Sequence, residues 1–462
     1  MHVVIAGAGP AGCVSALILS RVGIKCTIYE RATKDKLFSD VGSGYDITPS
    51  TVSIFETLGL LNMEPLRSSL QSPDGAYLCS LEGEYIRNEK IFNGKDSFEG
   101  YIMQRSSLQK TILEALNNEA CFNLVCGYEV VKFAEATETS DLNVTVRNRT
   151  DMATTSVTAD VLLACDGIHS SVRACMHSET KEDILHFCEC ITWWGRVDVP
   201  ANSTLMREFE KTQKQGNSYV IGFGTSSQPG SFMAGAKYSD ESKSSRMRIM
   251  WALTKEAESQ LLNSHLSLGG NKRGESDLTR RGGISGVEVK EAALVALGDK
   301  FHLGGEIIRS TSSDNITLAG LYDRDLLDIP WVKGRVALLG DAAHPQSPYM
   351  GQGANMAICD AYCVSKRLVH IAAKTLDKAS ENREIGIALR QYDNADRRKE
   401  VNSVIKSART YGSWSVSGSW WKTWIIHTVI KYVPMSWLLS DFERGDQTNE
   451  NALRKLENDI KG

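Results

Sequence analysis

The first thirty residues have the pattern of a strand, a glycine-rich turn, a helix and a second strand. "HVVIAG" (2–7) is a short apolar run typical of a buried parallel strand. "AGCVSALILSRVG" (11–23) has helical spacing and ends at a glycine, and "KCTIYE" (25–30) is a second strand. Since two parallel strands need a crossover element between them, this unit predicts an α/β fold with a buried parallel sheet.

Three glycines in the turn have the spacing GxGxxG. Gly7 permits the tight turn, Gly9 lets the backbone approach a pyrophosphate, and Gly12 lets the helix and strand pack closely. The free N–H groups at the start of the helix favour an anionic group. Glu30 ends the second strand and can bind both hydroxyls of a ribose. The pattern predicts a dinucleotide site, and a glycine-rich turn without a ligand is the alternative.

Two later runs, "DVLLACDG" (160–167) and "GRVALLGD" (334–341), are apolar and end in glycine and aspartate, which predicts two further strands of the same sheet. The sequence contains no second strand–GxGxxG–helix unit. We therefore expect one firmly held dinucleotide, and any second one must bind without its own unit of this kind.

The middle and the end of the chain have other patterns. Residues 190–253 alternate apolar and polar positions with aromatics, which predicts an antiparallel sheet with one covered face. Residues 267–286 are polar and glycine-rich and predict a surface loop or an inserted segment. From residue 356 onward the pattern is helical. Four aromatic residues of this region are expected mainly to be core residues, namely Trp193, Trp194, Tyr219 and Trp251. The last three are also candidates for the lining of a substrate pocket.

Composition narrows the function. The 462 residues carry a net charge of −4 with a pI near 6.2, so no basic field argues for nucleic acid or an anionic membrane. Eleven cysteines are scattered, which is typical of reduced, buried thiols, and the pair Cys188 and Cys190 lacks a second ligand pair for a metal. A strand begins within two residues of the first Met, and no apolar stretch reaches the length of a spanning helix. These features predict a cytoplasmic protein with a small organic partner and no metal.

Three motifs, in order, then resemble one family. They are "GAGPAG" (7–12), "DGIHSSVR" (166–173) and "GDAAHPQSPYMGQGANMAICDA" (340–361), and "YIMQRSSLQ" (101–109) also fits through Arg105. Over about residues 1–410 the chain resembles the single-component, class A FAD-dependent monooxygenases, with their salicylate hydroxylase-like, urate hydroxylase-like, zeaxanthin epoxidase-like and tetracycline destructase-like branches. Without the other motifs, Asp341 could equally well be interpreted as a helix N-cap or as a cofactor-binding residue.

The resemblance implies a Rossmann-like FAD-binding domain, of the type shared with glutathione reductase and p-hydroxybenzoate hydroxylase, with an inserted, mostly antiparallel substrate sheet and C-terminal helices. The expected boundaries are 1–75, 100–185 and 287–365 for the FAD-binding domain, 76–99 and 186–286 for the substrate-binding sheet, and 366–462 for the helical region.

The resemblance also implies roles. Asp341 should bind the ribityl hydroxyls of FAD, Arg105 should reach the ribityl–pyrophosphate region, and Glu30 should bind the adenosine ribose. The helix that begins at 351–355 should point its N-terminus at the flavin pyrimidine edge. The full set expected to hold FAD is Gly7, Gly9, Ala11, Gly12, Glu30, Arg31, Gly44, Arg105, Asp166, Gly167, Gly340, Asp341, Gly351, Gly353, Ala354 and Asn355.

The substrate should lie between the flavin and the 190–253 sheet, with "GSGYDITP" (42–49) as a further wall. Tyr45 and Pro348 join the three aromatics above as pocket candidates. His344 is expected to be a packing residue, and Asp360 to brace a helix.

The implied activity is NAD(P)H-consuming insertion of one oxygen atom from O2 into a small aromatic, polycyclic or isoprenoid substrate, through a C4a-hydroperoxyflavin. Urate is disfavoured because no arginine stands where the urate-type enzymes place theirs. The alternatives are an FAD-dependent dehydrogenase or oxidase of the same fold, and a non-enzymatic flavin-fold binding protein. The sequence does not choose between NADH and NADPH.

The segment 412–439 holds five of the nine tryptophans. Lys422, His427 and Lys431 interrupt its apolar run, so it cannot span a bilayer unaided. A helix packed on the body is the first expectation, and peripheral membrane contact or a lid over an apolar substrate are the alternatives.

Overall fold

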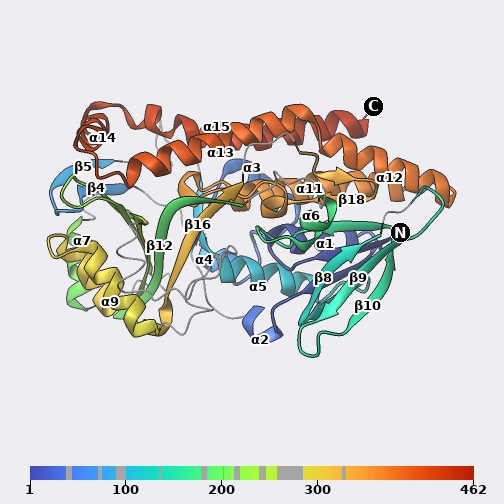
Figure 1. Cartoon of the computed structure of the whole chain (residues 1–462), viewed down its shortest axis with the longest axis horizontal. Helices are drawn as coiled ribbons and strands as arrows, with labels where there is room; N and C mark the ends of the chain where they lie inside the picture. Colours follow the sequence, from blue (N-terminus) through green and yellow to red (C-terminus); the bar gives the residue numbers. More distant parts are fainter. Residues whose placement is uncertain are drawn as a thin grey trace.

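A computed structural model describes residues 1–37, 44–70, 75–89, 100–134, 137–177, 185–200, 202–212, 219–238, 246–257, 285–324 and 329–461. The molecule is elongated in Figure 1, with one large sheet toward each end and two long helices, α13 and α15, along one side. Two predicted segments lie partly outside the described residues. They are the loop at 267–286, of which only 285 and 286 are described, and the wall at 42–49, of which 42 and 43 are not described.

The sheet near the N-terminus has six strands in the order β17-β18-β11-β1-β2-β7. The strands are β1 (His2–Ala6), β2 (Lys25–Glu30), β7 (Phe122–Cys126), β11 (Val161–Ala164), β17 (Val332–Lys333) and β18 (Val336–Leu338). All neighbours are parallel except β17, which runs antiparallel to β18. The β-α-β unit and the two later strands predicted from the apolar runs are confirmed.

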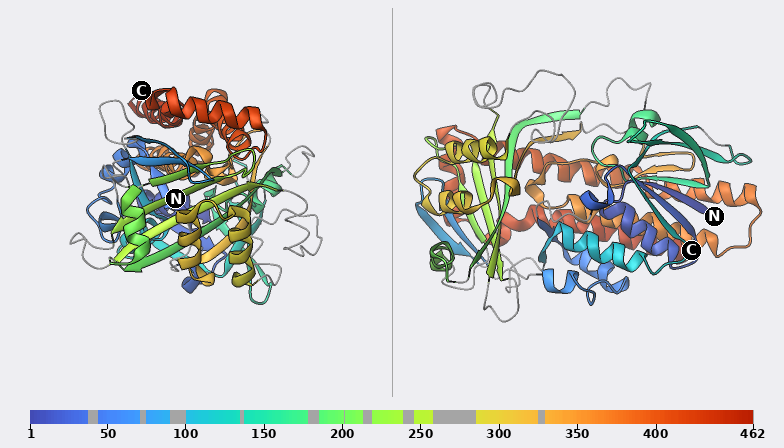
Figure 2. Two further views of the ribbon diagram at one scale, coloured as in Figure 1. Left: turned by 90° about the vertical axis from the view of Figure 1, so that its left-hand side faces the viewer. Right: turned by 90° about the horizontal axis from the view of Figure 1, so that it is seen from below.

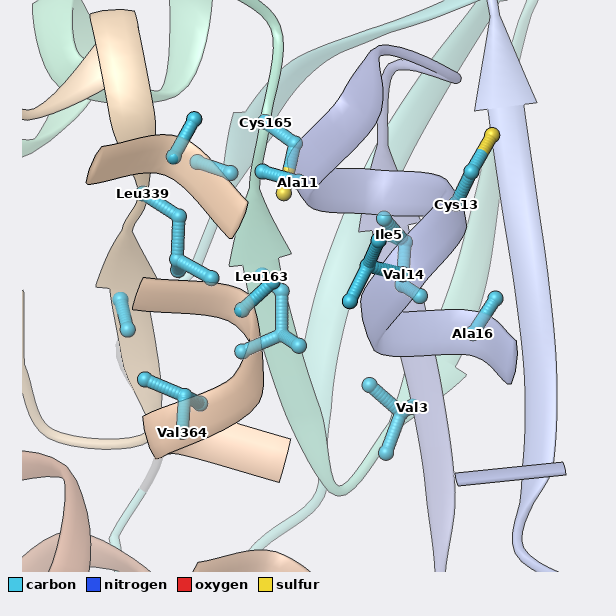
Figure 3. Close-up of a cluster of buried hydrophobic side chains, with 14 of the residues drawn as sticks. Val3, Ile5, Ala11, Cys13, Val14, Ala16, Leu163, Cys165, Leu339 and Val364 are labelled. Atoms are coloured by element: carbon cyan, nitrogen blue, oxygen red, sulfur yellow. The ribbon is translucent and has the colours of Figure 1, made fainter. Parts of the chain in front are cut away.

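Helices and a further layer of strands, within residues 128–159, bury the faces of this sheet. α1 (Pro10–Ser20) contacts both α5 (Arg105–Leu116) and α11 (Gly353–Ala372). Figure 3 shows Ile5 of β1, Leu163 of β11 and Val364 of α11 within one apolar cluster, and each of them is fully buried. Because the parallel strands are covered on both faces, their sequences are continuous apolar runs rather than alternating ones.

Smaller elements surround this layer. β8 (Tyr128–Phe133), β9 (Leu142–Asn148) and β10 (Thr154–Ala159) form an antiparallel sheet, and β3 (Gly44–Ile47) pairs with β6 (Tyr101–Gln104). The short helices are α2 (Lys34–Leu37), α3 (Pro49–Thr57), α4 (Leu66–Ser69) and α6 (Ser171–Met176).

The sheet at the other end has seven strands in the order β16-β12-β15-β14-β13-β4-β5. They are β4 (Ala76–Ser80), β5 (Tyr85–Glu89), β12 (Leu185–Pro200), β13 (Tyr219–Phe223), β14 (Ser231–Tyr238), β15 (Arg246–Glu256) and β16 (Ile316–Arg324). Only β13 and β4 run parallel, so the mostly antiparallel sheet is confirmed. α7 (Thr204–Thr212), α9 (Gly286–Leu297) and α10 (His302–Ser310) cover its outer face (Figure 2).

The expected domain boundaries stay a prediction, but one range needs correction. Residues 287–365 were expected wholly within the FAD-binding domain, whereas β16 hydrogen-bonds along β12 in the seven-stranded sheet, and α9 and α10 pack there too. The chain returns to the six-stranded sheet only at β17, because the apolar faces of α9 and α10 are buried against the other sheet.

Four helices follow α11: α12 (Lys378–Tyr392), α13 (Ala395–Ser415), α14 (Trp420–Tyr432) and α15 (Met435–Lys461). α15 contacts α11 and α13, whereas α14 lies beside β5 of the other sheet. The Arg87 guanidinium on β5 donates to the carbonyls of Ile430 and Val433. The helical region therefore holds both sheets together along one side (Figure 1). Among the described residues, no helix combines the length and the hydropathy that crossing a bilayer requires.

A buried charged cluster fixes α11 to the loop after β18. Asp360 accepts hydrogen bonds from His344 Nε2 at 2.6 Å, from the Gly340 N–H at 3.0 Å and from Arg397 Nη2 at 3.2 Å. Burial alone would raise the pKa of Asp360, but His344 and Arg397 hold it below its ordinary value. The structure thus places Asp360 and His344 as braces, in line with the expectation from the sequence.

Asp360→Ala should lower the free energy of unfolding by about 3–5 kcal/mol, because Arg397 would stay buried without its carboxylate. Urea denaturation near pH 7 measures this change. Because the folded pKa of Asp360 is lowered, its contribution is present above the unfolded pKa and is lost only as the pH falls through the folded value. Glu138→Ala, which breaks the exposed pair with Arg383, is the control and should leave the midpoint unchanged. Equal midpoints for both variants would show that the cluster does not brace the fold.

Candidate functional site

A cavity of about 690 Å³ lies between the two large sheets. Its inner end is at the carboxyl ends of the parallel strands, since Ala6, Glu30, Cys165 and Leu339 all line it. Open α/β sheets bind ligands at this position. The predicted site residues that line it are Gly7, Gly9, Ala11, Glu30, Arg31, Gly44, Tyr45, Arg105, Asp166, Gly167, Trp194, Gly340, Asp341, Pro348, Gly351, Gly353 and Ala354.

The glycine-rich turn leaves backbone facing the cavity. A Cβ on Gly7, where φ is +92°, would come within 2.5 Å of the Cys165 carbonyl oxygen. A Cβ on Gly12 would come within 2.1 Å of the Gly7 carbonyl oxygen, so Gly12 packs the helix onto the turn and does not line the cavity. The N-cap of α1 is Gly9, and no side chain caps this helix. Its first N–H groups therefore remain available to an anion.

Two carboxylates flank this turn. Glu30 accepts the N–H groups of Ala8 and Ala32, each at 2.7 Å, which fixes its orientation and leaves further lone pairs for a sugar hydroxyl. Asp166 Oδ2 accepts the Ser171 N–H at 2.8 Å at the start of α6. Asp166 Oδ1 is buried beside the cavity, where a donor from a ligand or a water molecule can reach it.

The middle of the cavity holds Asp341 and Arg105, whose side chains are exposed to it, and Tyr45. Burial beneath the protein surface raises the pKa of Asp341, and the nearby His344 and Arg105 oppose this effect. Burial also raises the pKa of Tyr45, against the charge of Arg105. Asp341 is not capping a helix of regular length, because it lies inside the short 3₁₀ turn η2 (Gly340–Ala342).

The loop before α11 forms the next wall. Gly351 has φ of +59°, and an added Cβ would come within 2.7 Å of Asp46 Oδ2. Asn355 does not line the cavity. Its amide donates to the carbonyls of Asp46 and Gly351, and its Oδ1 accepts the Thr48 N–H, so it fixes this loop against β3. No side chain caps α11, and Gly353 and Ala354 in its first turn face the cavity.

The outer half of the cavity is formed by the seven-stranded sheet and the C-terminal helices. Ile221, Phe223, Ser231, Phe232, Met233, Ala252 and Thr254 come from β13, β14 and β15, and Tyr411, Ser415 and Phe442 come from α13 and α15, with Tyr349 from the turn η3 (Pro348–Met350). Sequence reasoning missed the three helical residues. They lie far along the chain from every motif, and only the packing of the helices brings them to the cavity.

Two pocket candidates need correction. Trp251 is buried, and its indole N–H donates to Thr311 Oγ1 at 2.9 Å in the apolar layer under α9 and α10. Tyr219 is buried as well, and its hydroxyl donates to Asp46 Oδ1 at 3.1 Å. Neither lines the cavity. Trp193 lies in the core as expected, since it alternates with Trp194 along β12 and points to the opposite face.

Asp46 is a cavity residue that the sequence did not single out. It lies on β3, between the loop before α11 and Tyr219. Burial raises its pKa, and the hydrogen bond from Tyr219 partly opposes the rise. It is the one acidic side chain that the described residues place next to the outer half of the cavity.

The sequence matches the family described as "FAD binding domain" over residues 1–261 and 311–385. A 3-amino-4-hydroxybenzoate 2-monooxygenase, PtmB3 of Streptomyces platensis, is 26% identical over 425 residues, covering 89% of this chain and 87% of the relative. The 6-hydroxynicotinate 3-monooxygenase of Pseudomonas fluorescens is 23% identical, covering 87% of this chain and 90% of the relative.

Solved structures share the fold. Klebsiella pneumoniae HpxO complexed with FAD and uric acid superposes with a TM-score of 0.67 at 18% identity, covering 98% of this chain and 97% of that chain. The tetracycline destructase Tet(51) superposes with a TM-score of 0.56 at 16% identity, covering 98% of this chain and 96% of that chain.

Gly351→Ala and Gly23→Ala form a matched pair, because both glycines have positive φ but an added Cβ at Gly23 meets nothing within 4 Å. Each variant should lose about 1–2 kcal/mol of stability through backbone strain. Only Gly351→Ala should also displace Asp46 and weaken the binding of FAD. Urea denaturation and flavin fluorescence titration measure the two effects. Equal FAD affinities in the two variants would contradict the proximity of this loop to the flavin.

Proposed function

The chain belongs to the FAD binding domain family and is a class A FAD-dependent monooxygenase, and from this we propose that it uses NAD(P)H and O2 to oxygenate an uncharged organic substrate in the outer half of the cavity. The observation that carries the proposal is the division of the cavity. One half has glycine turns, uncapped helix starts and carboxylates, and the other half is mostly apolar.

The inner half fits FAD. The starts of α1 and α11 both face the cavity without side-chain caps. Each start carries the positive end of a helix dipole, which favours the binding of an anionic group. Asp166 lines the cavity, and Gly9 and Gly353 let the backbone approach a ligand. We assign the ribose to Glu30, the pyrophosphate region to the start of α1 with Asp166, and the ribityl chain to Asp341 and Arg105.

Bound FAD would supply the electron transfer and the oxygen activation. The chain's own residues bind, orient and exclude water. The start of α11 would stabilise negative charge on the flavin ring, because its N–H groups carry the positive end of the helix dipole. Phe442, Tyr411 and the face of β13–β15 would keep the reacting end dry.

The outer half favours a substrate without a formal charge. Apart from the carboxyl of Asp46, its described lining residues are aliphatic, aromatic or hydroxyl-bearing, and they include no arginine or lysine. A buried carboxylate there would lack a cationic partner, which is strongly unfavourable. This half therefore differs from a site built for the free acid of a hydroxybenzoate.

Asp46 is our candidate for the residue that positions the substrate. Its carboxyl lines the cavity beside Gly351 and is held by Tyr219. Since burial raises its pKa, it is suited to accept a proton from a substrate hydroxyl or N–H group. Its position between the loop and the sheet would orient that group toward the flavin.

Asp341→Ala should weaken FAD binding roughly 10- to 100-fold, since a lost hydrogen bond to a charged group is worth about 1.5–3 kcal/mol. The flavin content of the purified protein and a titration of the apoprotein measure the change. Asp314→Ala, on the exposed turn η1 (Ser313–Asn315), is the control. Unchanged flavin content in Asp341→Ala would remove the role assigned to Asp341.

A panel of phenolic acids and their methyl esters tests the substrate class. The esters should stimulate NADH or NADPH oxidation with O2 uptake, and should yield products one oxygen atom heavier. The free acids should have kcat/KM values roughly 100-fold lower, because an unpaired buried charge costs about 3 kcal/mol or more. Preference for the acids would overturn the proposed substrate class, and peroxide without an oxygenated product would indicate an oxidase instead.

A further inference from the structure

Five aromatic side chains at one end of the molecule are exposed. Trp420, Trp421, Trp424 and Tyr432 lie on α14, and Trp437 lies in the first turn of α15. Their exposed fractions range from 44% to 76%. We call these five residues the aromatic surface. Soluble proteins seldom expose so many large aromatic rings together without a partner for them.

The opposite side of α14 already has its partners. Ile430 and Ile426 pack into the apolar cluster of Ala76, Leu78 and Phe223 under the seven-stranded sheet. Arg87 donates to the carbonyls of Ile430 and Val433 at 2.7 and 2.9 Å, and His427 Nε2 lies 2.9 Å from the Gly224 carbonyl oxygen. The expectation that 412–439 contains a helix packed on the body therefore holds for this side alone. These contacts fix the rotation of α14 and leave the aromatic surface outside.

Two lysines lie among the aromatic rings of α14. Residues 401–440 contain no aspartate or glutamate, and the first acidic residues after Trp437 are Asp441 and Glu443 of α15. Lys422 Nζ lies over the rings of Trp414 and Trp421, and Lys431 Nζ lies over the ring of Tyr432, at 5.4–5.9 Å from the ring centroids. Lysines interleaved with tryptophan and tyrosine match the boundary between anionic headgroups and acyl chains.

We propose that the aromatic surface docks peripherally on a phospholipid bilayer that contains anionic lipids. The aromatic rings enter the headgroup boundary, and Lys422 and Lys431 contact the headgroups. Peripheral docking agrees with the finding that no helix among the described residues could cross a bilayer. α14 also lies at one extremity of the molecule in Figure 1.

The docked orientation would bring the cavity close to the lipid. Tyr411 and Ser415 lie on the helix before α14, Phe442 lies on the helix after it, and all three line the cavity. A substrate dissolved in the bilayer would then have a short route to the site. This consequence rests on the proposed function, whereas the docking itself does not.

The test is flotation of the FAD-loaded full chain with two kinds of vesicle. One kind contains phosphatidylcholine alone, and the other also contains about 30% phosphatidylserine, which gives it a negative surface potential. The protein should float with the anionic vesicles, and added salt should weaken the binding. The triple variant Trp420→Ala/Trp424→Ala/Trp437→Ala should lose at least tenfold in partition coefficient. Lys422→Glu/Lys431→Glu should lose binding to the anionic vesicles in particular.

The matched control is Met152→Ala/Val295→Ala, which removes two exposed apolar side chains far from α14 in the chain and should bind like the wild type. Flavin content and thermal unfolding show whether each variant is folded.

Absence of flotation by the folded wild type on both vesicle types overturns the proposal. So does unchanged flotation of the folded tryptophan variant. Loss of self-association in that variant, without flotation of the wild type, would assign the aromatic surface to a second copy of the chain. None of these outcomes depends on substrate turnover, so failure here is distinct from failure of the proposed oxygenation.

Discussion

Two helix starts, α1 and α11, face one cavity without side-chain caps, and the architecture of the site depends on this arrangement. Free N–H groups at a helix start need acceptors, and a buried start without them is unfavourable. Glycines at Gly7, Gly12 and Gly351 make the arrangement possible, since a Cβ at any of these positions would collide with protein atoms. An anionic group in the cavity could therefore accept hydrogen bonds at these helix starts.

The surrounding structure holds these two ends at a fixed separation. Asp360 ties α11 to the loop after β18, and Asn355 ties the start of α11 to β3. β12 and β16 connect the two large sheets, and the helices α13 to α15 run beside both (Figure 1). A ligand bound at the inner half therefore has the face of the second sheet as the opposite wall of its cavity.

Much of this arrangement could be predicted from local sequence. The β-α-β unit, the later apolar strands and the antiparallel sheet follow from periodicity and from glycine positions, which are local properties. Most residues named from the motifs line the cavity, because the carboxyl ends of parallel strands meet at one edge. Tyr411 escaped prediction, since its proximity to the cavity depends on how α13 packs against other elements, and Asp46 was not singled out within the predicted wall 42–49.

The sequence by itself determined the β-α-β unit, the glycines that a side chain would block, and the acids at strand ends, because these depend on backbone sterics within a few residues. Only the tertiary structure decided which aromatic residues face the cavity, which are core and which remain outside. Tyr219 and Trp251 became core because neighbouring strands and helices cover them, while the tryptophans of α14 stayed exposed because Ile430 and Arg87 fix the opposite side of that helix. Burial is a property of the assembled chain, since each side chain's surroundings come from segments distant in the sequence.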